Sequence, residues 1–161
     1  MTSVDAIDLR KALGKFATGV TIVTTQGVGD QLVGVTANSF NTVSLSPPIV
    51  LWSLTKTSST LSDFDHSGRF IINILSTDQV HLSQRFSKPI SDKFENVEHS
   101  KGIAGLPYLH DCVARFECKT LHRHEVGDHI LFLGQIEAYE HTHLEPLLFC
   151  KGQYAHSHAL N

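Results

Sequence analysis

The sequence predicts a mainly β protein, a β-barrel with appended short helices, formed by one domain over residues 1–161. Three observations predict this class. The apolar segments are mostly short and rich in β-branched residues, as strands are. Helical patterns are few and short, and strands do not alternate with helices as they do in a doubly wound sheet. A chain of 161 residues can bury one core of ordinary size but is short for two.

The chain opens with a predicted helix over residues 4–16, in which apolar side chains approximate one face. Ser3 or Asp5 can cap its start, and Gly19 can end it. The pattern then changes to two β-branched runs separated by the turn-forming letters QGVGD. These runs predict a β-hairpin over residues 19–25 and 31–37.

Two continuously apolar runs in the middle of the chain, residues 47–54 and 69–75, predict strands that are buried on both faces or line a barrel. Between them, a hydroxyl-rich start followed by spaced apolar residues and Gly68 predicts a short helix. A second short helix is predicted over residues 76–87.

The second half begins with a loop-like stretch over residues 87–111. Two long strands, residues 112–123 and 129–140, are then predicted to form a hairpin around the letters HEVGD. Residues 146–155 supply a last short strand. No internal repeat or low-complexity linker interrupts the chain.

Composition excludes several classes of function. Hydrophobic residues make up 41% of the chain and charged residues 18%, and no apolar run approaches the roughly 18 residues that a membrane helix needs. The first residues lack the features of a secretory signal, so a cytoplasmic location is expected. The formal net charge is −3 and basic residues are scattered, which indicates neither nucleic acid nor membrane as a partner.

The cysteines, Cys112, Cys118 and Cys150, are odd in number and have no C-x-x-C spacing. This argues against a disulfide framework and a thiolate zinc site, so we expect reduced, structural cysteines.

Polar residues gather where the strand over residues 31–37 ends. Thr36, Asn38 and Ser39 offer hydroxyl, amide and backbone groups together, which would suit the edge of a planar heterocycle. The simpler interpretation is a turn, because Asn and Ser commonly leave strands in this way.

Three hydroxyl residues, Thr57, Ser58 and Ser59, stand at the start of the predicted helix with Lys56 beside them. Hydroxyls, free backbone amides and a cation at a helix start favour an anion such as phosphate. An ordinary helix cap is the alternative, although a cap needs only one hydroxyl.

His129 follows Gly127 and Asp128 at a strand entrance, where the glycine turn or the carboxylate could fix the imidazole. A structural histidine is the simpler alternative. Gly134, inside the same strand, indicates a bulge, a close approach of a ligand or a barrel corner.

Other chemistries have weaker support. The eleven histidines include three H-x-H pairs, each of which could present two metal ligands on one strand face, but no H-E-x-x-H occurs and the pairs lie near turns and the C-terminal end. No metal site is therefore expected. Serine catalysis is not expected either, because no G-x-S-x-G is present.

Six segments occur in order along nearly the whole chain, roughly residues 8–156: LRKALGKFATGVTIVTT, GVTANSFNTVSLSPPIVLWSL, KTSST, FIINIL, LSQRFS and GDHILFLGQI. Together they resemble the short-chain flavin reductases, the reductase components of two-component flavin monooxygenases. The most specific parts are FATGVTIVTT, GVTANSF and GDH. The resemblance implies an FMN-binding split barrel of Greek-key type and an NAD(P)H:flavin oxidoreductase.

The resemblance also implies the binding residues. Those implied to line the flavin ring are Thr36, Ala37, Asn38, Ser39 and Ser53. Those implied to hold the flavin phosphate are Thr57, Ser58 and Ser59, with Phe86 and Ser87 as further additions. His129 is implied to face the nicotinamide side in an orienting or electrostatic role, with Tyr154 nearby.

The implied ligands are FMN or FAD, with NADH or NADPH as co-substrate, and the implied partners are a second copy of the chain and a monooxygenase component. Three alternatives stay open at this point. The same scaffold could reduce a cobalt corrinoid or a ferric complex, the protein could be a non-catalytic flavin-binding redox sensor, or it could be a histidine-rich metal-binding module.

Overall fold

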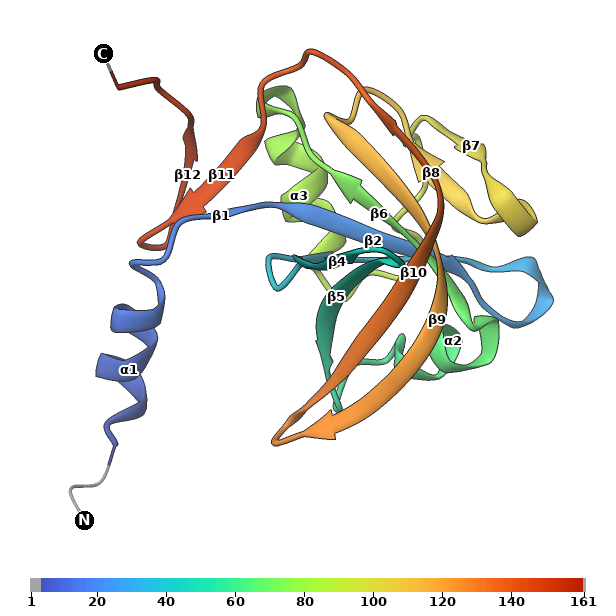
Figure 1. Cartoon of the computed structure of the whole chain (residues 1–161), viewed down its shortest axis with the longest axis horizontal. Helices are drawn as coiled ribbons and strands as arrows, with labels where there is room; N and C mark the ends of the chain where they lie inside the picture. Colours follow the sequence, from blue (N-terminus) through green and yellow to red (C-terminus); the bar gives the residue numbers. More distant parts are fainter. Residues whose placement is uncertain (1–3, 161) are drawn as a thin grey trace.

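Seven antiparallel strands form the main sheet of the protein, whose computed structural model describes residues 4–160 (Figure 1). Their order is β3-β2-β6-β9-β10-β5-β4. The strands are β2 (Thr21–Gln26), β3 (Leu32–Ala37), β4 (Asn41–Leu45), β5 (Pro48–Thr55), β6 (Arg69–Ile74), β9 (Ala114–Val126) and β10 (His129–His141). Since β3 and β4 stand at opposite ends of this order but only residues 38–40 join them, the sheet must curl until its edges approach. The predicted mainly β barrel is confirmed.

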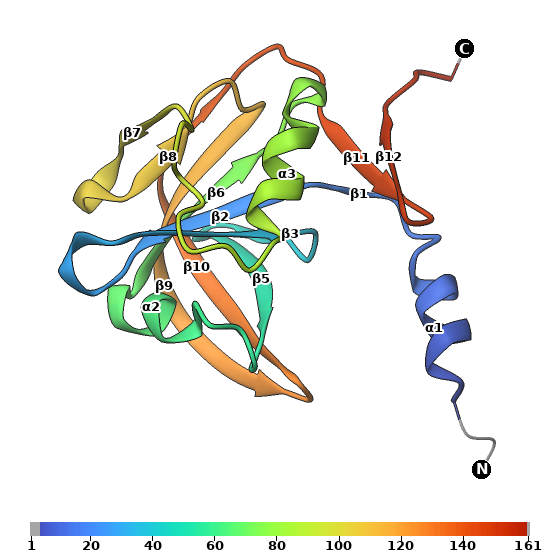
Figure 2. The same cartoon turned by 180° about the vertical axis from the view of Figure 1, so that it is seen from behind.

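Trp52 of β5 lies at the centre of the barrel and has no exposed surface. Its ring stacks on Phe132 of β10 with the centroids 5.0 Å apart, and it meets Phe64 and Phe70 edge-on at 4.8 and 5.7 Å. Offset and edge-on aromatic contacts add to the stabilisation that burial provides. A second apolar cluster, which includes Ile22, lies outside the barrel between β2 and the helix α3 (Val80–Phe86). Figure 2 shows α3 on this side of the barrel.

Gly134 lies at a register shift between β10 and β9, so the predicted bulge is confirmed. A side chain at this position would overlap the ring of Phe70 and approach Cβ of Cys118 to 3.1 Å. The group that approaches Gly134 closely is therefore a core phenylalanine rather than the ligand that the sequence offered as one alternative.

We expect Gly134→Ala to lower the free energy of unfolding by about 1–3 kcal/mol, because overpacking a close-packed core forces its neighbours to shift. Urea unfolding measures the change. Gly19→Ala is the matched control, since a Cβ at Gly19 has no atom within 4 Å; surface changes of this kind stay within about 0.5 kcal/mol. Equal effects of the two substitutions would contradict the packing described.

The helices and smaller sheets are appended to the barrel. The predicted short helices are α2 (Leu61–Ser67) and α3, which a 3-10 turn (Thr77–Gln79) precedes. The stretch 87–111, predicted to be loop-like, also contains a small hairpin. Residues 146–155, predicted as one strand, instead contain most of a second hairpin, which pairs with β1 in a separate three-stranded sheet. These strands are β7 (His99–Lys101) with β8 (Pro107–Leu109), and β1 (Thr18–Gly19) with β11 (Leu147–Cys150) and β12 (Gln153–His156). Two further 3-10 turns span Val28–Asp30 and Ile103–Gly105.

The first helix, α1 (Ala6–Leu13), projects away from the barrel on the same side as β11 and β12 (Figures 1 and 2). The Asp5 carboxylate caps it by accepting from the backbone N–H of Ile7, whereas Ser3 lies outside the described residues. The helix ends at Gly14, earlier than predicted. None of its side chains is buried, so the predicted apolar face does not pack on this chain's core. Among residues 4–160, no helix is both long and apolar enough to cross a membrane.

Candidate functional site

A pocket of about 590 Å³ lies beside the edge strand β3. The end of β3, the end of β5 and the segment after α3 line it. Eleven residues singled out from the sequence meet here: Thr36, Ala37, Asn38, Ser39, Ser53, Thr57, Ser58, Ser59, Phe86, Ser87 and His129. Residues that are up to 93 positions apart in the chain thus line the same pocket. Its volume is within the usual range for small-molecule sites, roughly 300–1,000 Å³.

Two of the hydroxyls hold the pocket together. Ser39 Oγ accepts a hydrogen bond from the Ser53 N–H at 2.9 Å and donates to the Ser53 carbonyl at 3.1 Å. Thr36 Oγ1 donates to the carbonyl of Ser83 in α3 at 2.7 Å. The first pair of bonds fastens the β3–β4 connection to β5, and the second fastens β3 to α3. Asn38, which is exposed between them, is therefore the side chain on this wall best placed to meet a polar ring edge.

The hydroxyl-rich segment precedes α2 as a turn. Thr57 Oγ1 lies 3.1 Å from Thr55 Oγ1, and Ser58 Oγ lies 2.9 Å from Thr60 Oγ1. Because α2 begins only at Leu61, the predicted hydroxyl cap of the helix start is not observed. An anion here would meet side-chain hydroxyls, including that of the exposed Ser59.

The positive charge of the pocket comes from lysines other than the one that the sequence pattern indicates. Lys88 and Lys93 line it, whereas Lys56, the predicted cation, forms an ion pair with Glu125 of β9 at 3.1 Å. Lys93 Nζ donates to the carbonyls of Phe86 at 2.8 Å and Gly34 at 3.2 Å. Partial burial lowers the pKa of Lys93 from its ordinary value. A bound anion would oppose this effect by favouring the ammonium form.

His129 stands at the first position of β10, opposite Thr55 of β5, and its side chain is 46% exposed. Its Nδ1 lies 2.7 Å from Oδ1 of Asp128. This hydrogen bond and the imidazole charge hold the pKa of the Asp128 carboxyl below its ordinary value. Since an ionised carboxylate only accepts hydrogen bonds, Nδ1 carries the proton. Nε2 is then the ring nitrogen available to a ligand.

Two predicted site residues have a different place. Tyr154 does not line the pocket, because it belongs to β12 in the separate three-stranded sheet. Its hydroxyl lies 2.9 Å from Ser83 Oγ. The carbonyl of the same serine accepts the hydrogen bond from Thr36, so Tyr154 contacts the wall of the pocket from behind. Phe86 does line the pocket but is fully buried, so it forms part of the supporting wall.

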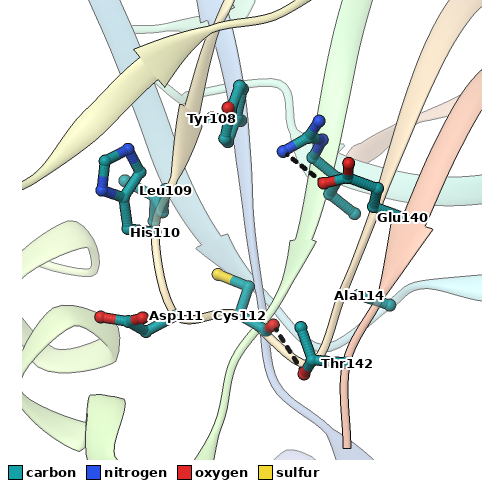
Figure 3. A pocket seen from close by; sticks show the side chains of 9 residues that line it. Tyr108, Leu109, His110, Asp111, Cys112, Ala114, Glu140 and Thr142 are labelled. Carbon is teal, nitrogen blue, oxygen red and sulfur yellow. Dashed lines mark hydrogen bonds and ion pairs between the residues drawn. The ribbon is translucent and has the colours of Figure 1, made fainter. Parts of the chain in front are cut away.

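A smaller cavity, of about 280 Å³, lies at β8 and the hairpin β9–β10 (Figure 3). The Arg115 guanidinium lies 3.7 Å from the centre of the Tyr108 ring and forms an ion pair with Glu140 at 2.9 Å. Thr142 donates to the carbonyl of Cys112, whose buried thiol has a pKa raised to about 12 by desolvation. Arg115 and Glu140 pair with each other and the thiol is neutral near pH 7, so this cavity offers little reactive chemistry.

The remaining candidates are scattered. Cys112, Cys118 and Cys150 are free cysteines, in agreement with the prediction. Within residues 4–160, no three histidine, cysteine or carboxylate side chains come together in a way that could hold a metal ion.

Comparison with known proteins agrees with this geometry. A family model described as "Flavin reductase like domain" matches residues 13–158. A "Probable flavin reductase" of Rhizobium meliloti strain 1021 is 41% identical over 91% of this chain, which spans only 47% of that relative. The chain therefore covers about half the length of this curated relative.

Other matches cover both proteins more fully. The "Flavin-dependent monooxygenase, reductase subunit HsaB" of Rhodococcus jostii strain RHA1 is 37% identical over 94% of this chain and 78% of its own length. The solved structure of "Streptomyces globisporus C-1027 NADH:FAD oxidoreductase SgcE6 in complex with NAD and FAD fragments" superposes with a TM-score of 0.89 at 34% identity, over 94% of this chain and 92% of that one. The curled sheet, the pocket and these matches together show that the chain belongs to the flavin reductase like family.

Proposed function

We propose that the protein is an NADH-dependent flavin reductase, which reduces FMN or FAD in the pocket between β3, β5 and the segment after α3. The observation that carries this proposal is the meeting of three features in one pocket: a polar wall at Asn38, hydroxyls and lysines suited to phosphate, and an imidazole at its rim. The similar SgcE6, whose printed name is an NADH:FAD oxidoreductase, supports the choice of NADH.

The residues present fit a flavin. The wall of residues 36–39 and Ser53 offers backbone and amide groups to the edge of the ring system, and residues 57–59 with Lys88 and Lys93 offer donors to its phosphate. When bound, a flavin supplies a ring that accepts hydride, so the protein mainly has to hold that ring and the nicotinamide with the reacting atoms about 3–3.5 Å apart. This task requires neither a nucleophile nor a strong base.

His129 is assigned an orienting and electrostatic role toward the nicotinamide. The Asp128 carboxylate fixes the ring by binding Nδ1, and the Asp128 carbonyl is fixed in turn by the Lys56 N–H at 2.9 Å. Because the Asp128 backbone and carboxylate are both hydrogen-bonded, the imidazole keeps its direction, as positioning of a second substrate requires.

Equilibrium titration tests the binding half of this proposal. Quenching of flavin fluorescence should show saturable binding of FMN and FAD, with weaker binding of riboflavin because it lacks the phosphate. Absence of binding for all three flavins would refute the proposed function.

We further propose that the reduced flavin is delivered to a monooxygenase, in the cytoplasm. The similarity to HsaB, named as the reductase subunit of a flavin-dependent monooxygenase, supports the partner. The three free cysteines support a reducing compartment.

We also propose that the protein is a homodimer. The support is apolar surface that this chain leaves uncovered: Ile7 in the first helix and Phe16 just after it are 71% and 77% exposed, and Leu45 at the end of the edge strand β4 is 93% exposed. Large apolar side chains that a chain leaves exposed are available to an association site. Sedimentation equilibrium should give twice the mass of one chain at micromolar concentration, and a monomer under these conditions would contradict the dimer.

A further inference from the structure

A chain of hydrogen bonds joins the separate three-stranded sheet to the wall of the proposed flavin pocket. Tyr154 of β12 places its hydroxyl 2.9 Å from Ser83 Oγ of α3. The carbonyl of Ser83 accepts a hydrogen bond from Thr36 Oγ1 of β3 at 2.7 Å. Ser83 is thus bonded on one side to the three-stranded sheet and on the other to the edge strand that lines the pocket.

Ser83 lies at the centre of this chain and is only 2% exposed. Its carbonyl also accepts the backbone N–H of Ser87 at 3.2 Å, so both of the lone pairs of this oxygen are used. Thr36 and Ser87 line the flavin pocket. One buried residue therefore fixes two parts of the wall, the end of β3 and the residue that follows α3.

Close packing between α3 and β3 adds to this connection. A Cβ at Gly34 of β3 would come within 2.6 Å of the ring of Phe86, the last residue of α3. The helix and the strand therefore touch without spare volume, and close-packed contacts transmit strain. A shift in the last turn of α3 is consequently expected to move the wall of the pocket.

The Tyr154 hydroxyl determines the direction of the Ser83 side chain. With this hydroxyl present, Ser83 Oγ has a partner outside its own helix. Without it, a buried serine hydroxyl turns to the carbonyl four residues earlier in the helix, and such bonds often bend helices. The Tyr154 ring has a contact of its own, because it meets the Phe149 ring edge-on at 5.4 Å. Loss of the hydroxyl alone therefore leaves the ring in place.

We propose that Tyr154 is a positioning residue for the flavin, which acts through Ser83 on the wall formed by Thr36 and Ser87. This inference rests on the proposed function, because it concerns the same pocket. It gives the three-stranded sheet a part in flavin binding, although none of the strand residues of that sheet lines the pocket.

The test removes each hydroxyl of the chain separately. Dissociation constants for FMN and riboflavin, which share the ring system, are measured by fluorescence titration for Tyr154→Phe, Ser83→Ala and the double variant. The thermal midpoint of each variant is recorded beside them. Tyr139→Phe is the matched control, since Tyr139 on β10 is 66% exposed and does not line the pocket.

We expect Tyr154→Phe and Ser83→Ala each to raise both dissociation constants about three- to tenfold, the scale of one net hydrogen bond. The double variant should bind flavin as each single variant does, because both substitutions break the same bond. Tyr139→Phe should bind both flavins as the wild-type protein does.

Coupling to Thr36 separates this role from a merely structural one. Thr36→Val breaks the chain at its last step, so Tyr154→Phe should weaken flavin binding less in a Thr36→Val background than in wild type. If Tyr154 only anchors its own sheet on the barrel, the two substitutions have independent effects.

Three results would overturn the inference. Tyr154→Phe could lower the thermal midpoint while it keeps wild-type flavin affinity, Ser83→Ala could keep that affinity, or the effects of Tyr154→Phe and Thr36→Val could be fully additive. In each case the wild-type protein and Tyr139→Phe still bind flavin, whereas failure of the proposed function would abolish binding in all of them.

Discussion

Replacing Ser59 by alanine should weaken FMN binding while leaving riboflavin binding unchanged. Ser59 offers an exposed hydroxyl in the turn before α2, at the end of the pocket proposed to receive the flavin phosphate. A hydrogen bond to a charged group contributes about 1.5–3 kcal/mol, so the dissociation constant for FMN should rise roughly 10- to 100-fold. Fluorescence titration with both flavins measures the change.

Ser62→Ala is the matched control for FMN binding, because Ser62 is also an exposed serine on this segment but does not line the flavin pocket. A parallel loss of riboflavin affinity in Ser59→Ala would show that the variant disturbs the pocket as a whole. Unaltered FMN affinity would place the phosphate elsewhere.

Replacing His129 by alanine should lower kcat/KM for NADH by about 10- to 100-fold, the scale expected when a substrate loses its productive orientation. The flavin dissociation constant should stay within about twofold of the wild-type value, since His129 is assigned to the nicotinamide side and its half-exposed side chain stands at the rim of the pocket. Steady-state kinetics with NADH varied at saturating flavin, together with flavin titration, gives both quantities.

His124→Ala is the control for this experiment. His124 lies on β9 of the same hairpin and is exposed, but it does not line the pocket. If His129→Ala retained wild-type kinetics, or if it lost flavin binding to the same extent as turnover, the assignment to the nicotinamide side would be wrong.

The strands and the pocket were largely predictable from sequence because their signals are local. β-branched runs such as residues 21–26 form strands where their own composition favours them. The hydroxyls at residues 57–59 and the imidazole of His129 were recognisable by residue type. No local pattern shows that these residues lie in one pocket. That expectation came from the family resemblance.

The positions of the lysines could not be predicted, because they depend on long-range contacts. Lys93 belongs to a stretch without periodicity, and its role at the pocket arises only because Gly34 and Phe86 bring their carbonyls to it. Lys56 was expected at the anion site, but cross-strand geometry places Glu125 within 3.1 Å of it. Contacts between residues that are far apart in the sequence determine both outcomes.

The hydroxyls show a related limit. Thr36 and Ser39 were expected to line the ring, and they do lie in the pocket, yet their side chains bond to Ser83 and Ser53 of the protein. Sequence indicates that a hydroxyl is present in the site. Whether it meets the ligand or holds the wall depends on which carbonyl lies within reach.

The most direct test of the proposed function is the oxidation of NADH by the purified protein, followed by absorbance with and without added FMN or FAD. We expect sustained oxidation of many equivalents of NADH per protein, at a rate that depends on added flavin. Reduction of a single bound flavin without further turnover, or no oxidation of NADH with any flavin, would contradict it.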